Sequence, residues 1–266
     1  IFWDNRSTDR SPIIAKSYDD RLKYYLSENM TNLGEARNLA MNKAKGKYIA
    51  FLDCDDLFLI DKLKTQVEFM EKNDLVFSYG SSIIINETGT EIKRRMVKNY
   101  SGYIFNSLLK HYEIAMQSVM IKRDIIDNEN FRFNKNLIYS PDYNLSMNIA
   151  AKYEIGVIKT PIIKYRLVSG SLSDQTTSIA SSEMKHTLNQ LSEKFPELKK
   201  IYKKEFKSAF NKSQYYSAVS DIYQKDRKLA RDKLIPIIFS HYAYFILYLL
   251  LFFPIPEKYI LKILGR

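Results

Sequence analysis

Residues 46–56 read Gly-Lys-Tyr-Ile-Ala-Phe-Leu-Asp-Cys-Asp-Asp, a short apolar run that leads directly into three carboxylates. The apolar part, 48–52, is too short for a helix and predicts a buried strand. Residues 33–45, before it, carry apolar side chains at helical spacing and end at Gly46, a typical helix C-cap. Residues 61–72, after it, have helical spacing again, and the apolar runs 75–79 and 82–86 predict two further strands. A helix, a strand, an acidic loop and a second helix in this order indicate an α/β domain.

The acidic loop is the strongest chemical signal in the chain. Asp53, Asp55 and Asp56 follow the predicted strand at its C-terminal end, where open α/β sheets bind ligands. Their mutual repulsion is relieved by a divalent cation, and Mg²⁺ or Mn²⁺ prefers oxygen ligands and can bridge a diphosphate. A solvated acidic turn, with an aspartate capping the next helix, explains the same spacing. The spacing alone does not separate these two interpretations.

The charge of the chain is unevenly distributed. The 266 residues include 41 Lys and Arg, 30 Asp and Glu and one cysteine, which gives a net charge of +11. A single cysteine excludes a disulfide framework within the chain and a cysteine-based zinc site. Residues 1–182 carry 25 basic and 22 acidic residues, a net of +3, whereas 183–266 carry 16 and 8, a net of +8. We therefore predict an α/β domain over 1–182 and a basic helical extension over 183–266. Within the extension we expect helices over 183–210, with a break near Pro196, and over 214–233.

The extension contains an uncharged segment, 234–256, for which three interpretations stay open. Its length is sufficient to span a bilayer, but Pro236, Ser240 and His241 interrupt its first half. Flanking basic residues favour a segment that lies on an anionic membrane surface. The third interpretation is packing against the α/β domain or against a second subunit of a homo-oligomer. Basic charge beside an apolar segment favours an anionic membrane over nucleic acid as the partner of this region.

Five segments over residues 1–175 resemble, in order, the family 2 glycosyltransferases of the GT-A fold. They are Trp-Asp-Asn-Arg-Ser-Thr-Asp at 3–9, Asn-Leu-Gly-Glu-Ala-Arg-Asn at 32–38, the stretch 44–56, Tyr-Ser-Pro-Asp-Tyr-Asn-Leu at 139–145, and Tyr-Arg-Leu-Val-Ser-Gly-Ser-Leu-Ser at 165–173. The resemblance implies a Rossmann-like nucleotide-binding domain and transfer of a sugar from a nucleotide-sugar donor, by default a UDP-sugar. It also implies a growing bacterial cell-surface glycan, free or lipid-linked, as acceptor, and a cytoplasmic enzyme peripheral on the inner face of the cell membrane.

The resemblance implies a donor site built from several segments. Its nucleotide-sugar-binding residues are Asp4, Asn32, Arg37, Asp53, Asp55, Arg166, Ser171 and Ser173. Asp4 matches the aspartate that accepts a hydrogen bond from the base, Arg37 a cation near the phosphates, and Asp55 and Asp56 the ligands of Mn²⁺ or Mg²⁺. From the residues alone, Asp4 is also a turn former, Arg37 a solvated helix charge and 165–173 an ordinary flexible loop.

Asp142 matches the catalytic base of the family. The reaction inverts the anomeric carbon in one displacement, so one carboxylate deprotonates the acceptor hydroxyl while the cation stabilises the leaving nucleoside diphosphate. From the residues alone, Asp142 is also a candidate N-cap of a helix over 143–152.

Three departures from the family pattern keep other functions open. Pro141 stands where the family has an acid, Val168 stands where many relatives carry histidine, and the first strand–helix unit of about 30 residues is missing from the chain. These departures favour a catalytically inactive GT-A-like scaffold as the alternative. A nucleotidyltransferase also uses carboxylate-bound metal, but it needs a Gly-rich triphosphate loop that the chain lacks. A nucleic-acid-binding protein is disfavoured because the acidic loop repels a polyanion.

Overall fold

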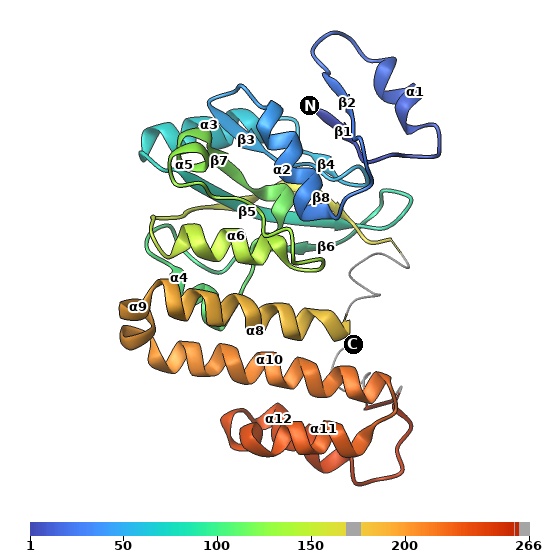
Figure 1. Cartoon of the computed structure of the whole chain (residues 1–266), viewed down its shortest axis with the longest axis vertical. Coiled ribbons are helices and arrows are strands. Elements are labelled where there is room, and N and C mark those ends of the chain that lie inside the picture. Colours follow the sequence, from blue (N-terminus) through green and yellow to red (C-terminus); the bar gives the residue numbers. More distant parts are fainter. Residues whose placement is uncertain (169–176, 258, 261–266) are drawn as a thin grey trace. The chain divides into compact units, whose positions relative to one another are not determined.

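The computed structural model describes residues 1–168, 177–257, 259 and 260, and the chain divides into two compact units. The first unit contains residues 1–108 and 112–168, and the second contains 109–111 and the chain from 169 onward. Figure 1 shows the first unit as a mixed sheet with helices and the second as helices throughout. The domain boundary predicted after residue 182 falls inside a helix of the second unit, α8 (Thr177–Lys194).

The first unit is built on a mixed β-sheet, which confirms the α/β prediction. Within the described residues the strands of this sheet lie in the order β3 (Tyr48–Ala50), β7 (Met120–Lys122), β5 (Phe77–Ile85), β8 (Gly156–Arg166) and β4 (Leu57–Phe58), with β6 (Glu91–Arg95) also paired to β5. β5 and β8 run parallel, and every residue of β5 is buried. A smaller parallel pair is formed by β1 (Phe2–Asp4) and β2 (Tyr24–Leu26).

The helices of the first unit follow the sequence pattern closely near the acidic loop. They are α1 (Ser11–Lys16), α2 (Leu33–Lys43), α3 (Lys62–Lys72), α4 (Phe105–Lys110), the 3-10 helix η1 (Met116–Ser118), α5 (Arg123–Asn128) and α6 (Pro141–Ala150). α2 and α3 confirm the helices predicted over 33–45 and 61–72. The strand predicted over 48–52 is shorter, because pairing with β7 ends at Ala50.

Two strands predicted over 75–79 and 82–86 are one continuous strand, β5. The apparent interruption contains Gly80, where the pairing with β8 shifts register. A Cβ at Gly80 would lie 2.8 Å from Ile162 Cδ1, so a larger residue does not fit at this position. The glycine therefore marks a close approach of two strands and not a turn.

The second unit is helical, as predicted, but its helices begin and end at other residues than predicted. Its elements are α8 (Thr177–Lys194), α9 (Pro196–Ile201), α10 (Lys203–Tyr223), α11 (Arg227–Leu234), the 3-10 helix η2 (Ile235–Ser240) and α12 (Tyr242–Leu250). The predicted break at Pro196 is confirmed. The predicted break between 210 and 214 is wrong, because α10 is continuous there, and the helix predicted over 214–233 is divided between α10 and α11. The chain leaves α10 at residues 224–226, where Lys225 has a φ of 64°.

The uncharged segment 234–256 is divided between η2 and α12. Pro236 stands in the first turn of η2, and His241 is the extended residue that separates the two helices and caps α12. Among the described residues, no helix combines the length and the apolarity that crossing a bilayer requires.

Lys62, in the first turn of α3, is buried, and the described part of the chain offers it no counter-ion. Its side chain is 1% exposed, and among the described residues its ammonium has no hydrogen-bond partner. The ammonium lies 4.1 Å from the centre of the Phe58 ring, a cation–π contact that partly offsets the lost hydration. Burial lowers the pKa of Lys62 to about 7.

We expect Lys62→Met to stabilise the protein near neutral pH and below. Because the pKa of Lys62 is about 7 in the folded state and near 10.5 in the unfolded state, the wild type gains stability as pH rises between these values. The variant's advantage, on the order of 2 kcal/mol at low pH, should shrink toward pH 10. Thermal unfolding of both proteins across this pH range measures it. A difference that is constant with pH contradicts the assignment.

Candidate active site

Asp53 is fixed at the end of β3 by two neighbouring elements. Its Oδ1 accepts a hydrogen bond of 2.8 Å from Arg37 Nη2 of α2, and its Oδ2 accepts one of 2.7 Å from Gln117 Nε2 of η1. The Arg37 side chain is only 11% exposed, so this charge pair is shielded and holds its geometry better than a surface pair. The sequence motif predicted that Arg37 and Asp53 share the site, but it gave no sign of Gln117.

Asp56 ties the acidic loop to the end of β8. Its Oδ1 accepts a 2.7 Å hydrogen bond from the backbone N–H of Arg166, and its residue is 4% exposed. Its Oδ2 is buried and has no hydrogen-bond partner among the described residues. Burial raises the pKa of Asp56 to about 6, against the lowering effect of the Arg166 hydrogen bond.

The side chain of Arg166 also connects β8 to the acidic loop. Its Nε donates to the carbonyl oxygen of Asp55 at 2.8 Å, and its Nη1 donates to the carbonyls of Asn86 and Glu87 at 3.1 and 2.9 Å. One guanidinium therefore links the acidic loop to the turn after β5. These bonds give Arg166 a structural role, and its contact with a donor phosphate stays a prediction.

Asp55 is the exposed carboxylate of the loop. Asp53 accepts a hydrogen bond from Arg37, and Asp56 accepts one from Arg166. These bonds hold the loop on both sides of Asp55, so its exposed side chain has a defined position. No cluster of three or more His, Cys, Asp or Glu suited to a metal ion occurs in the part of the chain that the structure describes. The donor set fits a cation held by one carboxylate, with the remaining oxygen ligands coming from a diphosphate and water.

Asp142 is the second residue of α6, after Pro141. The N-cap is Ser140, so the interpretation of Asp142 as the cap is wrong, and its Oδ1 instead accepts a 2.9 Å hydrogen bond from the Tyr143 N–H. Burial raises the pKa of Asp142, the positive charge of Arg37 lowers it, and the charge of Asp53 raises it. A carboxylate with a raised pKa is suited to take a proton from a hydroxyl group.

Close packing of α2 against α6 brings these charges into one site. Gly34 is buried in the first turn of α2, and a Cβ there would lie 3.2 Å from Pro141 Cβ and 3.3 Å from the Asn134 carbonyl. One turn later, Arg37 lies over the Phe133 ring, 5.5 Å from its centre. The glycine of the motif therefore sets the approach of the helix that carries Arg37 to the helix that carries Asp142.

Asn38 holds the segment before α6 against α2. Its Nδ2 donates to the Phe133 carbonyl at 2.8 Å, and its Oδ1 accepts from the Phe133 N–H at 2.9 Å. Asn38 follows Arg37 in the motif, and this position could have indicated a role in the site. Its partner, Phe133, lies 95 residues away along the chain. Asn38 is a positioning residue that the sequence analysis did not assign.

Asn32 and Asp4 are occupied by internal hydrogen bonds. Asn32 Oδ1 accepts from the Glu35 N–H at 2.9 Å and so caps α2, while its Nδ2 donates to the Lys135 carbonyl. Asp4, at the end of β1, is 1% exposed and accepts from Tyr24 Oη at 2.5 Å and from the Ser7 N–H at 2.7 Å.

The environment of Asp4 keeps it ionised. Burial alone raises the pKa of Asp4, but the hydrogen bonds from Tyr24 and Ser7 outweigh burial and leave the pKa below its ordinary value. An ionised acceptor fits the predicted contact with a base N–H, which stays a prediction. Ser171 and Ser173, also predicted to bind the donor, lie outside the described residues.

The comparisons identify the family. The description "Glycosyl transferase family 2" matches residues 1–138, and the chain belongs to this family. The relative named UDP-Glc:alpha-D-GlcNAc-diphosphoundecaprenol beta-1,3-glucosyltransferase WfgD, from Escherichia coli, is 31% identical over 176 residues, 65% of this chain and 67% of that protein. An uncharacterized glycosyltransferase of Rickettsia conorii is 39% identical over 172 residues, 64% of this chain but only 28% of that protein.

Solved structures support the predicted GT-A-like fold. The crystal structure of S. aureus TarS 1-349 in complex with UDP-GlcNAc matches with a TM-score of 0.55 and 15% identity, over 87% of this chain and 77% of that chain. At this identity the match concerns the fold alone. Family membership separates the chain from the nucleotidyltransferase and nucleic-acid-binding alternatives.

Proposed function

We propose that the protein is an inverting, metal-dependent glycosyltransferase that moves a sugar from a UDP-sugar to a hydroxyl of a bacterial cell-surface glycan. The observation that carries the proposal is the arrangement of two kinds of carboxylate. Asp53 and Asp56 are fixed by hydrogen bonds so that Asp55 stands exposed between them, while Asp142 stands apart with a raised pKa. Donor binding and proton removal are thereby separated.

The donor side is assigned to the two sheets and the acidic loop. Asp4 accepts a hydrogen bond from the base, and Asp53, held by Arg37 and Gln117, accepts from the ribose. Asp55 holds the Mn²⁺ or Mg²⁺, with Asp56 as the second predicted ligand. When bound, the cation supplies positive charge to the leaving diphosphate. Arg37 adds a fixed positive charge on the same side.

The acceptor side is assigned to α6. The carboxylate of Asp142 takes the proton of the acceptor hydroxyl as the hydroxyl oxygen forms its bond to the anomeric carbon. The bond between that carbon and the diphosphate oxygen breaks in the same step, and the configuration inverts. The raised pKa of Asp142 makes it a stronger base than an ordinary aspartate. Pro141 offers no second carboxylate, so Asp142 acts alone.

The acceptor is proposed from chemistry and from named relatives. WfgD is named for transfer to a sugar on diphosphoundecaprenol. We assign a lipid-linked or surface glycan to this chain as well, with the enzyme peripheral on the inner face of the cell membrane. The basic second unit, whose residues 183–266 carry a net charge of +8, is the part proposed to attach it.

A panel of nucleotide sugars tests the proposed activity. We expect the full chain to release nucleoside diphosphate from one or a few UDP-sugars in the presence of Mn²⁺ and to stop when the ion is chelated. Release in the absence of divalent ions contradicts the metal role, and binding without turnover of any donor favours the inactive scaffold.

Gln117 provides a test of the donor site that sequence motifs did not suggest. We expect Gln117→Ala to weaken UDP binding about tenfold, because Asp53 loses a charge-assisted hydrogen bond. Gln117→Glu should weaken it further, since it places a second carboxylate against Asp53. Titration calorimetry with UDP measures both. Equal affinity in all three proteins contradicts the role of Gln117.

A further inference from the structure

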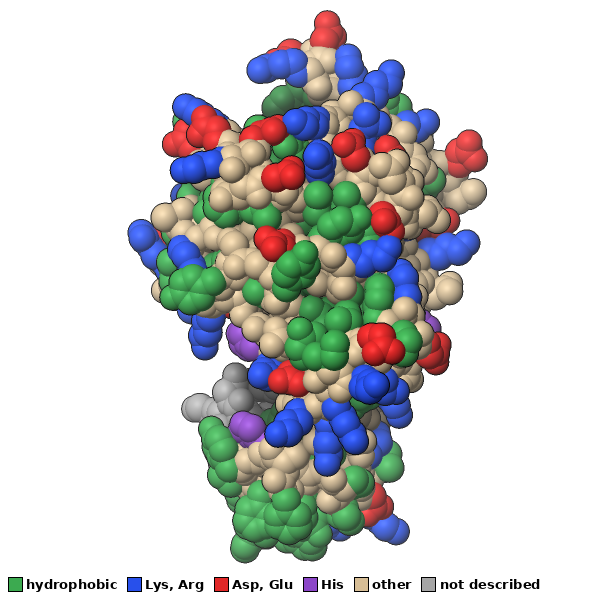
Figure 2. Space-filling view, turned by 90° about the vertical axis from the view of Figure 1, so that its left-hand side faces the viewer, with side chains coloured by type: hydrophobic (Ala, Val, Ile, Leu, Met, Phe, Trp, Pro, Cys, Tyr) green, Lys and Arg blue, Asp and Glu red, His purple; other side chains and the backbone are tan. Residues whose placement is uncertain are grey.

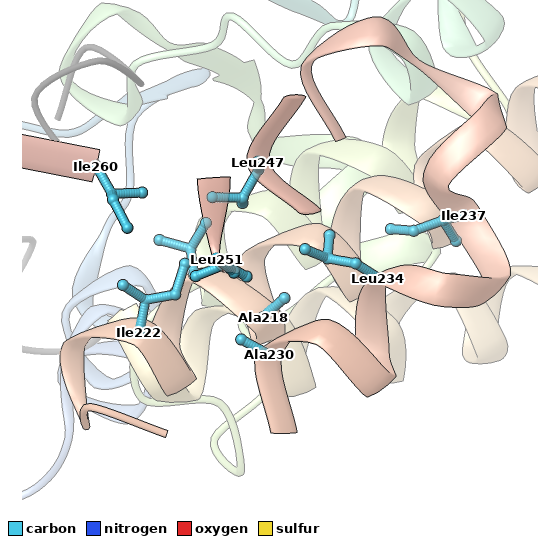
Figure 3. Packing of buried hydrophobic residues seen from close by; sticks show 9 residues of the cluster. Ala218, Ile222, Ala230, Leu234, Ile237, Leu247, Leu251 and Ile260 are labelled. Atoms are coloured by element: carbon cyan, nitrogen blue, oxygen red, sulfur yellow. The ribbon is translucent and has the colours of Figure 1, made fainter. Parts of the chain in front are cut away.

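The second unit contains a helix that is apolar on all sides. α12 carries no charged residue, and one side of it enters a buried cluster. Leu247 is fully buried there, and Leu251, just beyond the helix, is 1% exposed. The buried members of the cluster are Ala218, Val219, Ile222, Ala230, Leu234, Ile237, Leu247, Leu251 and Ile260, most of which Figure 3 labels. The cluster therefore accounts for only one side of α12.

The other side of α12, together with η2 and the turn after α12, carries an exposed set of large apolar residues, which we call the aromatic face. Its members are Phe239, Tyr242, Phe245, Ile246, Leu249, Phe252 and Phe253. Phe239 is 90% exposed and Tyr242 75% exposed, and the spacing of the members from 242 to 253 is that of one helical side. Figure 2 shows hydrophobic side chains gathered on the second unit, in the lower part of the view. Single exposed apolar residues are common, but a gathered set marks an interaction surface.

Two arginines of α11 hold the end of the aromatic face in place. Arg227 donates from Nη1 to the Phe253 carbonyl at 2.7 Å and from Nη2 to the Ile255 carbonyl. Arg231 donates to the Leu251 carbonyl at 3.1 Å, and its guanidinium lies 4.7 Å from the centre of the Phe252 ring. Phe252 and Phe253 remain 58% and 57% exposed although the backbone around them is fixed. A partner therefore meets a surface that is already ordered.

Charge decides which partner fits this surface. On the turn and helix that lead to the aromatic face, exposed Lys225 and Lys228 stand beside exposed Asp226 and Asp232, so the positive charge belongs to the unit as a whole, with a net of +8 over residues 183–266. Two copies of such a unit repel each other, whereas an anionic bilayer attracts it. Aromatic side chains beside basic residues are typical of helices that lie in the interface of a membrane.

We infer that the aromatic face inserts into the interfacial layer of an anionic lipid bilayer, with Phe252 and Phe253 at the end of the face that the two arginines hold in place. This inference deepens the proposed attachment to the membrane and rests on it. It names the surface that makes the contact, and it does not depend on which sugar is transferred.

Vesicle co-sedimentation of the full chain tests the inference. The probes are vesicles of phosphatidylcholine alone and of phosphatidylcholine with about 30% phosphatidylglycerol. We expect binding to the anionic vesicles that Phe252→Ser/Phe253→Ser weakens about a hundredfold, because two phenylalanine side chains lose their burial. The matched control is Ile13→Ser/Ile14→Ser, which alters two residues of α1 that are 66% and 53% exposed and should leave binding unchanged. Binding that the Phe pair does not weaken overturns the inference.

A fluorescent variant tests insertion without removing the apolar surface. Trp3 is the single tryptophan of the chain and lies in the first unit. In Phe252→Trp we expect new fluorescence that shifts to the blue on vesicles and is quenched by brominated lipids, while the wild type shows no quenching. A concentration-dependent dimer that the Phe252→Ser/Phe253→Ser variant loses would instead assign the face to a second copy. Nucleotide-sugar turnover without vesicles, measured in parallel, shows separately whether the proposed activity fails.

Discussion

Asp142→Asn will abolish sugar transfer and leave UDP binding nearly unchanged. Asparagine keeps the shape of the side chain and can still accept the Tyr143 N–H, but it takes no proton from an acceptor hydroxyl. We expect the turnover number to fall by a factor of about 10² to 10⁴. Product formation measured with saturating donor, together with calorimetric titration of UDP, separates catalysis from binding.

Two further measurements distinguish a catalytic Asp142 from a structural one. Because the pKa of Asp142 is raised in the folded protein, its charge opposes folding at neutral pH, so Asp142→Asn should raise the melting temperature there. Turnover of the wild type should fall, as pH decreases, at a higher pH than an ordinary aspartate titrates. The matched control is Asp124→Asn, an exposed aspartate at the second position of α5. Unchanged turnover in Asp142→Asn contradicts its role as the base.

Asp55→Asn will remove the contribution of Mn²⁺ to UDP binding. Asp55 is the exposed carboxylate of the acidic loop, and its loss leaves the cation with ligands from diphosphate and water only. We expect UDP affinity in Mn²⁺ to fall about tenfold to a hundredfold, toward the affinity measured in chelator. The control is Asp61→Asn, an exposed aspartate at the start of α3.

Asp56→Asn separates the two carboxylates predicted to hold the metal. Asparagine still accepts the Arg166 N–H, so the loop keeps its tie to β8. If the cation rests on Asp55, UDP binding by this variant keeps its Mn²⁺ dependence. If Mn²⁺ dependence is lost in Asp56→Asn and kept in Asp55→Asn, the assignment to Asp55 is wrong.

The local pattern of the sequence was sufficient for the elements around the acidic loop. Helical spacing over 33–45 predicted α2, and the apolar run before Asp53 predicted β3. The predicted C-cap, Gly46, is wrong, because α2 ends at Lys43 with Ala44 as its C-cap. The break in β5 was wrong because Gly80 permits a close strand approach as readily as a turn. Such a difference depends on Ile162, a residue of another strand, which no local pattern contains.

Long-range hydrogen bonds explain what the sequence did not predict in the site. Gln117 reaches Asp53 across 64 residues, and Arg166 reaches Asp55 across 111. A single glutamine before a strand, or an arginine at the end of one, is too common to indicate a partner. Family resemblance placed Arg166 near the donor, whereas its hydrogen bonds to backbone carbonyls emerged only from the fold.

In the second unit, too, the length of an apolar segment predicted only part of the structure. The interruption predicted in the first half of 234–256 is confirmed, since Pro236 lies in η2 and His241 separates η2 from α12. The sequence did not predict that α12 buries only one side. Which residues stay exposed depends on packing against α10 and α11. The aromatic face is therefore a property of the folded unit.

The anomeric configuration of the product is the most direct test of the proposed single displacement. The full chain is incubated with Mn²⁺, an α-linked UDP-sugar that it turns over, and a lipid-linked glycan acceptor, and the new linkage is observed by proton NMR. A single displacement driven by Asp142 predicts a β-linkage as the first product. An α-linkage would mean that the configuration is retained. It would contradict a single displacement in which Asp142 is the base and the acidic loop binds the donor.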